Sequence, residues 1–424
     1  MKIIEFPVRE IWSEILRRPA ADSAALELGV SNILKEVREH GDVAVKKFSN
    51  LFDKVALENI EVSAQEMRVA VESVPAQLQS AILQAKKNIE KFHLSQLRPE
   101  EKIETMEGIH CWRKSVAIEK VGLYIPGGTA PLFSTLLMLG IPALIAGCKE
   151  IILCSPPSKD GTIHPAILFA ANAVGIKRIF KIGGVQAIAA MAYGTESIPR
   201  VYKIFGPGNQ YVTCAKQLVQ KDGVAIDMPA GPSEVAVYAD QSANPFFVAS
   251  DLLSQAEHGA DSQSLLVTDS RKILEEVVSA IDQQLKNLPR ADIAKKALEH
   301  SRAILVNDER HAMELLNAYA PEHLILSCVN AEKLAADVIN AGSVFLGHYS
   351  PESAGDYASG TNHTLPTNGY ARSYSGVSVD SFVKKITFQQ LTKKGLENIS
   401  DTVITMAEAE GLKAHAEAVR VRVR

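Results

Sequence analysis

The stretch Val116-Ala-Ile-Glu-Lys-Val-Gly-Leu-Tyr-Ile125, followed by Pro126-Gly127-Gly128, marks the change of pattern that decides the fold. Its apolar and β-branched residues predict a strand over Val116–Ile125, and the proline and glycines turn the chain into a helix from about Pro131. Three more strand–helix units follow, with strands predicted near Ile151–Cys154, Arg178–Ile182 and Val201–Phe205. This alternation predicts a mostly parallel sheet with right-handed crossovers.

The same pattern restarts after the turn-rich segment Asp227–Ser233, so two α/β units in tandem are expected. The strands of this second run are predicted at Glu234–Tyr238, Ser264–Thr268, Ala303–Val306, Leu324–Ser327 and Ser343–Leu346. Upstream, a short arm with one helix is predicted around Arg9–Arg18. After it, apolar residues recur at helical spacing from Ser23 to about Leu97 and predict helices. Downstream, Ser350–Ser381 reads as loop, and Thr387–Arg424 reads as two helices with no strand to cover.

Composition indicates a soluble globular protein of two or more domains. The chain has 424 residues, of which 46% are hydrophobic and 22% charged. A formal charge of −4 gives no electrostatic reason to expect nucleic acid or an anionic membrane as partner. The most apolar run, Leu136–Cys148, is too short to span a bilayer. Five cysteines without a CxxC pair suit a reducing cytoplasm, and charged residues near the N-terminus argue against a signal peptide.

The segment Asp251-Leu-Leu-Ser-Gln-Ala-Glu-His-Gly-Ala-Asp261 offers half of a metal site. Gln255 and His258 are three positions apart on the last turn of a helix that Gly259 is expected to end as a left-handed cap. An imidazole and an amide oxygen on one rigid surface can bind a metal. The alternative is a helix end whose histidine complements the macrodipole. The metal interpretation therefore depends on ligands elsewhere in the chain.

The polar loop Ser350–His363 supplies candidates for those ligands, because it offers Glu352, Asp356 and His363. Asp356 is a plausible third ligand, since long loops in compact domains tend to be functional. The alternative is an ordinary solvated loop.

Pro321-Glu322-His323 places a carboxylate and an imidazole next to each other just before an apolar strand. Such a pair can act as general base and proton shuttle if both reach one cavity. Strand neighbours point to opposite faces, so this function needs the bend that Pro321 favours. The alternative is a histidine of the core. Glu410 and His415, on the last predicted helix, are surface residues on sequence alone.

A broken nucleotide fingerprint follows one predicted strand. Gly206-Pro-Gly208-Asn209 gives G-x-G, but Tyr211 stands where the third glycine belongs. Asp227 lies at about the right distance for an acid that binds ribose, although it sits in a turn-rich stretch. Backbone amides near Gly127, Gly128 and Gly208 could approach a pyrophosphate at helix N-termini. A tight βα turn without a ligand explains the same residues.

Several runs together carry a resemblance along nearly the whole chain. They are Tyr124–Thr135, Phe205–Asn209, Asp227–Glu234, Leu252–Gly259, Pro321–His323 and Gly342–His363. In these runs the sequence resembles the L-histidinol dehydrogenase family. The resemblance implies a zinc-dependent, NAD-linked four-electron oxidation of L-histidinol to L-histidine through bound L-histidinaldehyde, the last steps of histidine biosynthesis. A related zinc/NAD dehydrogenase of another small alcohol is the alternative.

The resemblance also implies an architecture and an assembly. It implies two Rossmann-like α/β domains without the usual fingerprint, in a cytoplasmic homodimer whose C-terminal tail crosses to the partner's active site. The expected division is residues 1–20 as an N-terminal arm, 21–123 with 233–380 as the first domain, 124–232 as the second domain, and 381–424 as the helical tail.

The residues of the implied site follow from the same resemblance. One Zn²⁺ per subunit is expected on Gln255, His258, Asp356 and His415, and the acid–base pair is Glu322 with His323. NAD contacts are expected from Tyr124, Gln186 and Asn209. Substrate contacts, with His363 close by, are expected from Ser233, Gln255, His258, His323, Asp356, Glu410 and His415.

Overall fold

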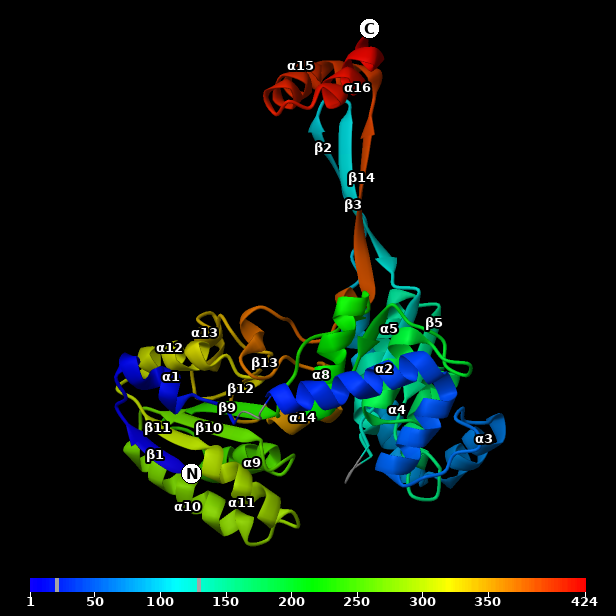
Figure 1. Ribbon diagram of the computed structural model, residues 1–424. Coiled ribbons are helices and arrows are strands. Elements are labelled where there is room, and N and C mark those ends of the chain that lie inside the picture. Colours follow the sequence, from blue (N-terminus) through cyan, green and yellow to red (C-terminus); the bar gives the residue numbers. More distant parts are fainter. Residues whose placement is uncertain (20–22, 128–130) are drawn as a thin grey trace.

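The computed structural model describes residues 1–19, 23–127 and 131–424. Within these ranges the chain forms two α/β bodies that lie side by side, and a long antiparallel arm projects away from both (Figure 1). The C-terminal helices lie at the tip of this arm. The predicted α/β class with two parallel sheets is therefore confirmed.

The first parallel sheet has the strand order β1-β11-β10-β9-β12-β13. Its strands are β1 Lys2–Glu5, β9 Glu234–Ala239, β10 Gln263–Thr268, β11 Arg302–Leu305, β12 His323–Ser327 and β13 Ser343–Leu346. Its helices are α1 Trp12–Ile15, α9 Pro245–Ala256, α10 Arg271–Leu285, α11 Ala291–His300, α12 Glu309–Tyr319 and α13 Ala331–Ala335. Along β9, Val235 and Val237 pack with α9, α10 and α11, whereas Tyr238 packs with α1, α12 and α13. Both faces are covered, which is why these strands are apolar throughout.

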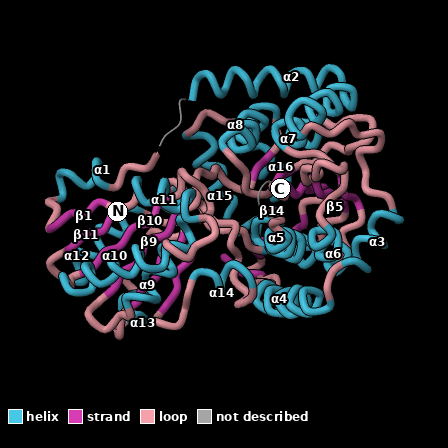
Figure 2. Tube along the Cα trace, turned by 90° about the horizontal axis from the view of Figure 1, so that it is seen from below, coloured by secondary structure: helices cyan, strands magenta, loops and turns pink. Residues whose placement is uncertain are grey.

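The second parallel sheet has the order β6-β5-β4-β7-β8. Its strands are β4 Lys120–Tyr124, β5 Glu150–Cys154, β6 Arg178–Phe180, β7 Lys203–Phe205 and β8 Ala225–Ile226. The helices that connect them are α5 Phe133–Ala146, α6 Pro165–Val174, α7 Gly184–Tyr193 and α8 Gln210–Val219. Figure 2 shows α7 and α8 on one side of the strands and α5 and α6 on the other. The chain reverses its direction of sheet growth between β4 and β7, and this is the place where open α/β sheets bind ligands.

The N-terminal helices pack on the second sheet. They are α2 Ser23–Phe48, α3 Ala64–Ser73 and α4 Ala76–Leu94, and their main helical neighbours are α7, α6 and α5, respectively. The apolar side chains of α2 continue the core beneath α7, and Gly41, at φ +51°, interrupts this helix. This packing differs from the expected grouping of residues 21–123 with 233–380. The expected N-terminal arm, in turn, supplies β1, which pairs with β11 of the first sheet.

The projecting arm was not expected from the sequence. It consists of β2 Lys102–Met106, β3 Ile109–Ala117 and β14 Val383–Leu391, in the antiparallel order β14-β3-β2. The single strand predicted over Val116–Ile125 is wrong, because the chain changes partners between Ala117 of β3 and Lys120 of β4. The two tail helices begin only at Lys393, and the residues before it belong to β14; the helices are α15 Lys393–Ala409 and α16 Lys413–Val423.

Short elements complete the fold. They are the 3₁₀ helices Arg9–Ile11, Gln220–Asp222, Tyr370–Arg372 and Val379–Phe382, the π-helical turn Ser49–Asp53, and helix α14 Glu352–Tyr357. The predicted helix over Arg9–Arg18 is therefore shorter, and the predicted loop Ser350–Ser381 contains a helix. No helix in the described ranges is long and apolar enough to cross a bilayer.

Gly206 lies in the turn between β7 and α8. Its substitution tests how closely the backbone packs where the sheet reverses its direction of growth. Its φ is +129°, and a Cβ there would lie 2.0 Å from the carbonyl oxygen of Tyr124. We expect Gly206→Ala to lower the free energy of unfolding by about 3 kcal/mol or more, because backbone strain and overlap add.

Gly223→Ala is the matched control, because Gly223 also has a positive φ, +85°, but no atom within 4 Å of an added Cβ. This variant adds backbone strain without overlap, so we expect the free energy of unfolding to fall by about 1–2 kcal/mol. Urea unfolding of both variants measures the difference, and equal losses would contradict the close approach at Gly206.

Candidate functional site

A cleft of about 1480 Å³ lies between the two bodies. The second sheet contributes the carboxyl ends of its strands, through Pro126 after β4 and Gly206–Asn209 after β7. The first sheet contributes the opposite edge, because Glu322 and His323 lie at the amino end of β12. Two sheet edges of opposite polarity therefore face each other across the cleft.

Gln255 and His258 lie where α9 ends. The helix stops at Ala256, and Glu257 still has a right-handed backbone. Gly259 has no positive φ, so the predicted left-handed glycine cap is wrong. A further turn replaces it, in which the His258 amide donates to the Gln255 carbonyl at 3.2 Å. The three-residue spacing still directs both residues into the cleft, whose walls include them.

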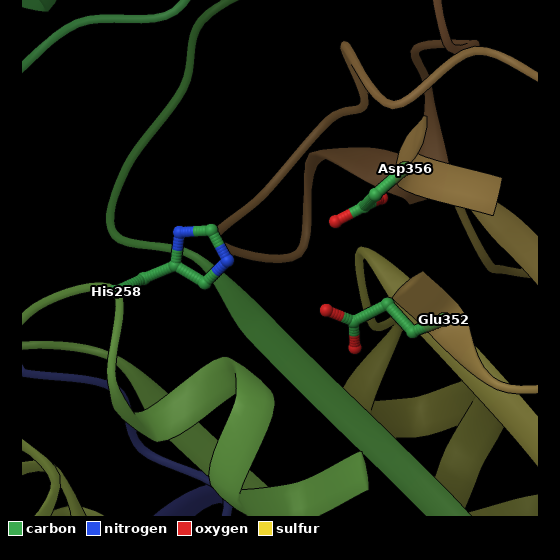
Figure 3. A group of neighbouring side chains, drawn as sticks. All are labelled: His258, Glu352 and Asp356. Atoms are coloured by element: carbon green, nitrogen blue, oxygen red, sulfur yellow. The ribbon is translucent and has the colours of Figure 1, made fainter. Parts of the chain in front are cut away.

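Helix α14 brings two carboxylates to the same place. Glu352 and Asp356 are four positions apart, so this short helix puts them on one face. Their oxygens and an imidazole nitrogen of His258 lie within 4.8 Å of one another. Figure 3 shows the three side chains turned toward a common space. Nitrogen and oxygen donors in this arrangement suit a divalent cation such as Zn²⁺.

Gln255 is buried and lies beside Glu352. One terminal atom of its amide lies 2.7 Å from Glu352 Oε1, and the other lies 3.1 Å from the Glu234 amide nitrogen. Glu352 thus joins Gln255 to the His258–Asp356 group.

The Glu322–His323 pair reaches the same cluster. The bend that lets neighbouring residues share one cavity comes from Ala320, which is left-handed at φ +54°, directly before Pro321. Glu322 Oε2 lies 3.6 Å from His323 Nδ1, and His323 Nε2 lies 3.5 Å from Asp356 Oδ1. His323 Nε2 and Asp356 Oδ1 are among the buried side-chain atoms of the described residues that have no hydrogen-bond partner. Buried orphans of this kind point to a ligand that completes the site.

Buried charge governs the protonation of this cluster. Burial raises the pKa of Glu322 to about 8 and the pKa of Glu352 to about 8. Burial alone would lower the pKa of His323, but the carboxylates of Glu352, Glu322 and Asp356 outweigh it and raise that pKa well above its ordinary value. The cluster thus holds three carboxyl groups around one imidazole, and a bound divalent ion would stabilise their charged forms.

The residues expected to contact a nucleotide separate into two places. Asn209 lines the cleft and caps α8, and its Oδ1 accepts from the Tyr211 and Val212 amides at 3.1 Å each. Tyr124 and Gln186 are buried outside the described lining of the cleft. The Tyr124 hydroxyl accepts from the Gly184 amide at 3.1 Å, and Gln186 Nε2 donates to Asp53 at 3.4 Å.

Asp227 holds the turn together from within. Its carboxylate forms a buried ion pair with Lys216 and accepts from the Gly206 amide at 2.8 Å. These internal partners occupy the carboxylate that was considered for ribose binding. Gly128 lies outside the described residues.

The remaining expected residues divide between the cleft and the arm. Ser233 and His363 line the cleft, and His363 contacts Thr135 Oγ1 at 3.2 Å and the Asp356 carbonyl at 2.8 Å. Glu410 and His415 are exposed at the tip of the arm, away from the cleft of this chain (Figure 1). A single chain therefore does not bring all the expected residues together.

A family model described as histidinol dehydrogenase matches residues 16–423. The chain belongs to the histidinol dehydrogenase family. It is therefore an oxidoreductase.

Similar proteins agree over the full length. The chain is 61% identical over 423 residues to a histidinol dehydrogenase of Bacteroides fragilis, a match that covers 100% of this chain and 99% of the relative. It is 52% identical over 424 residues to one of Mannheimia succiniciproducens, covering 97% and 98%. The crystal structure of histidinol dehydrogenase from Elizabethkingia anophelis matches with a TM-score of 0.98 at 55% identity, covering 100% of this chain and 98% of that one.

Sequence reasoning gave no role to two residues of the site, Glu234 and Arg18, and it offered Glu352 only as a candidate ligand in a loop. The four-residue spacing of Glu352 and Asp356 was a usable signal, but it counts only in a helix, and a loop was expected there. Glu234 and Arg18 gave no signal, because their link joins positions 216 residues apart.

His258 tests the metal cluster. We expect His258→Asn to weaken zinc binding at least about tenfold, since it removes a nitrogen donor, while the fold persists because this side chain is exposed. Elemental analysis, chelator competition and circular dichroism measure both effects. His40→Asn, at an exposed position on α2, is the control. Unchanged zinc affinity in folded His258→Asn would exclude the ligand assignment.

Proposed function

We propose that the protein oxidises L-histidinol to L-histidine, the last steps of histidine biosynthesis. The reaction passes through bound L-histidinaldehyde and uses two NAD and one water for each histidinol. One Zn²⁺ per subunit is held by Gln255, His258 and Asp356, together with His415 of the partner subunit. Glu322 and His323 are the acid–base pair.

One observation carries this proposal. The acid–base pair and the nitrogen–oxygen donor cluster meet in one cleft, with His323 Nε2 and Asp356 Oδ1 3.5 Å apart. An alcohol bound at the cluster therefore lies beside a group that can take its proton. The family membership of the whole chain supports the same reaction.

The residues divide the chemistry between them. Zn²⁺, when bound, polarises and orients the substrate's amine and imidazole nitrogens. NAD, when bound, accepts hydride. A bound cation would offset the carboxylates that raise the pKa of His323. The neutral imidazole of His323 then takes the hydroxyl proton as the alcohol becomes the aldehyde. Glu322 then takes a proton from the water that adds to the aldehyde, and the resulting hydrate gives up the second hydride. The cleft retains the aldehyde between the two steps.

The arm supports a shared site in a homodimer. Helices α15 and α16 pack on each other at the far end of β14, and Glu410 and His415 are exposed there (Figure 1). A tail held away from its own body can reach a second copy. Glu410 of the partner subunit would then contact the substrate, and His415 of the partner subunit would complete the metal ligands.

The stoichiometry of NADH tests the reaction. We expect two NADH for each L-histidinol consumed, because both oxidations occur before release, and we expect chelation to abolish the activity until zinc is restored. Absorbance of NADH with L-histidinol and with a panel of other small alcohols measures this. One NADH per substrate, or a better substrate in the panel, would favour a related zinc/NAD dehydrogenase of another small alcohol.

Subunit mixing tests the shared site. His258→Asn and His415→Asn are each expected to be inactive, and random exchange at equal ratio makes half of the dimers heterodimers. Each heterodimer then has one site with both histidines and one with neither, so about one quarter of wild-type activity should return.

Two affinity tags must show that the subunits have exchanged. Exchange without recovered activity would mean that His415 serves its own chain or no site. The same mixture before exchange is the control.

A further inference from the structure

A nearly buried arginine from the N-terminal segment lies behind the acid–base pair. Arg18 is 14% exposed in its side chain and forms an ion pair with Glu234, which is 2% exposed. Its guanidinium makes two contacts with that carboxylate, one of them from Nη2 to Oε1 at 2.8 Å. It also lies 4.0 Å from the centre of the Tyr319 ring. A planar, two-pronged cation of this kind fixes a carboxylate in orientation as well as in charge.

Glu234 in turn contacts both members of the pair. Its Oε1 accepts from the Glu322 amide at 3.2 Å, and its own amide donates to Glu322 Oε2 at 2.9 Å. Its carbonyl oxygen lies 3.2 Å from His323 Nδ1. One residue thus fixes the Glu322 backbone, the Glu322 carboxylate and the His323 ring.

Arg18 also holds the turn that aims the pair into the cleft. Its Nη2 donates to the carbonyl of Tyr319 at 2.8 Å and to that of Ala320 at 3.4 Å. These are carbonyls at the C-terminal end of α12, where cations are favourable. Ala320 is left-handed at φ +54°, a conformation that an alanine keeps only when its surroundings enforce it.

We propose that Arg18 is a positioning residue for the acid–base pair. By binding Glu234 and the carbonyls of Tyr319 and Ala320, it fixes where Glu322 and His323 lie in the cleft. This inference rests on the proposed function, in which these two residues move the protons.

Substitutions at three residues test the positioning role. Arg18→Met removes the guanidinium that binds Glu234. Glu234→Gln keeps the size of that side chain but removes its charge. Arg271→Met is the matched control, because Arg271 forms an exposed ion pair with Glu5 that also ties the N-terminal segment to the first body. For each variant, kcat per zinc-loaded subunit, the KM values and the melting temperature are measured.

If the acid–base pair is misplaced, kcat should fall while the KM for NAD stays nearly unchanged. We expect Arg18→Met and Glu234→Gln to lower kcat by about tenfold to a hundredfold, with less than about a twofold change in the KM for NAD. Arg271→Met should keep the wild-type kcat. Because Arg18 lines the cleft, methylguanidinium should restore part of the kcat of Arg18→Ala in a saturable way, and urea should not.

A purely structural role gives a different pattern. A lower melting temperature in Arg18→Met with wild-type kcat per zinc-loaded subunit would overturn the proposal. If Arg18→Met does not fold, wild-type kcat in Glu234→Gln overturns it in the same way. Failure of the wild-type protein to oxidise L-histidinol would instead refute the proposed function, so the two outcomes remain distinct.

Discussion

The site depends on keeping several carboxylates close together in a buried space. Glu322, Glu352 and Asp356 surround His323, and Glu234 lies directly behind them. Burial disfavours each charge, as the raised pKa of Glu322 and Glu352 shows. The arrangement is tolerable if the buried carboxylates are balanced by positive charge. Arg18 neutralises Glu234 from behind, and the open side of the cluster offers nitrogen and oxygen donors to a cation.

The two bodies present different edges of their sheets to the cleft that holds this cluster. Strand β12 enters the cleft with its amino end, just after the left-handed turn at Ala320. A strand that began without such a turn would direct Glu322 and His323 to opposite faces of the sheet. The second body supplies the ordinary carboxyl edge of a doubly wound sheet, with Gly206 packed against the end of β4. The unusual edge therefore carries the proposed acid–base pair, and the usual edge carries the turn expected to receive a nucleotide.

Local patterns in the sequence were sufficient for both parallel sheets and for most of their strands. They failed where long-range pairing decides the structure. Residues 116–125 are equally apolar on both sides of the change from β3 to β4, and only pairing with β14 separates the two strands. The helical segment α2–α4 has an apolar face, but nothing local tells which sheet it covers. At the site, the spacing of Gln255 and His258 was informative, whereas the proximity of Glu352 to Gln255 depends on how α14 packs on α9.

The ends of helices α9 and α8 give the two walls of the cleft opposite partial charges. Helix α9 ends at the donor cluster, so its negative terminus favours a cation beside His258. Helix α8 begins at Asn209 on the opposite body, and its positive terminus favours an anionic group. The two walls are thus suited to ligands of opposite charge, as a metal and a dinucleotide phosphate are. Because the tail helices α15 and α16 lie far from both walls, neither dipole depends on them (Figure 1). A chain that has lost its tail should therefore keep this polarity.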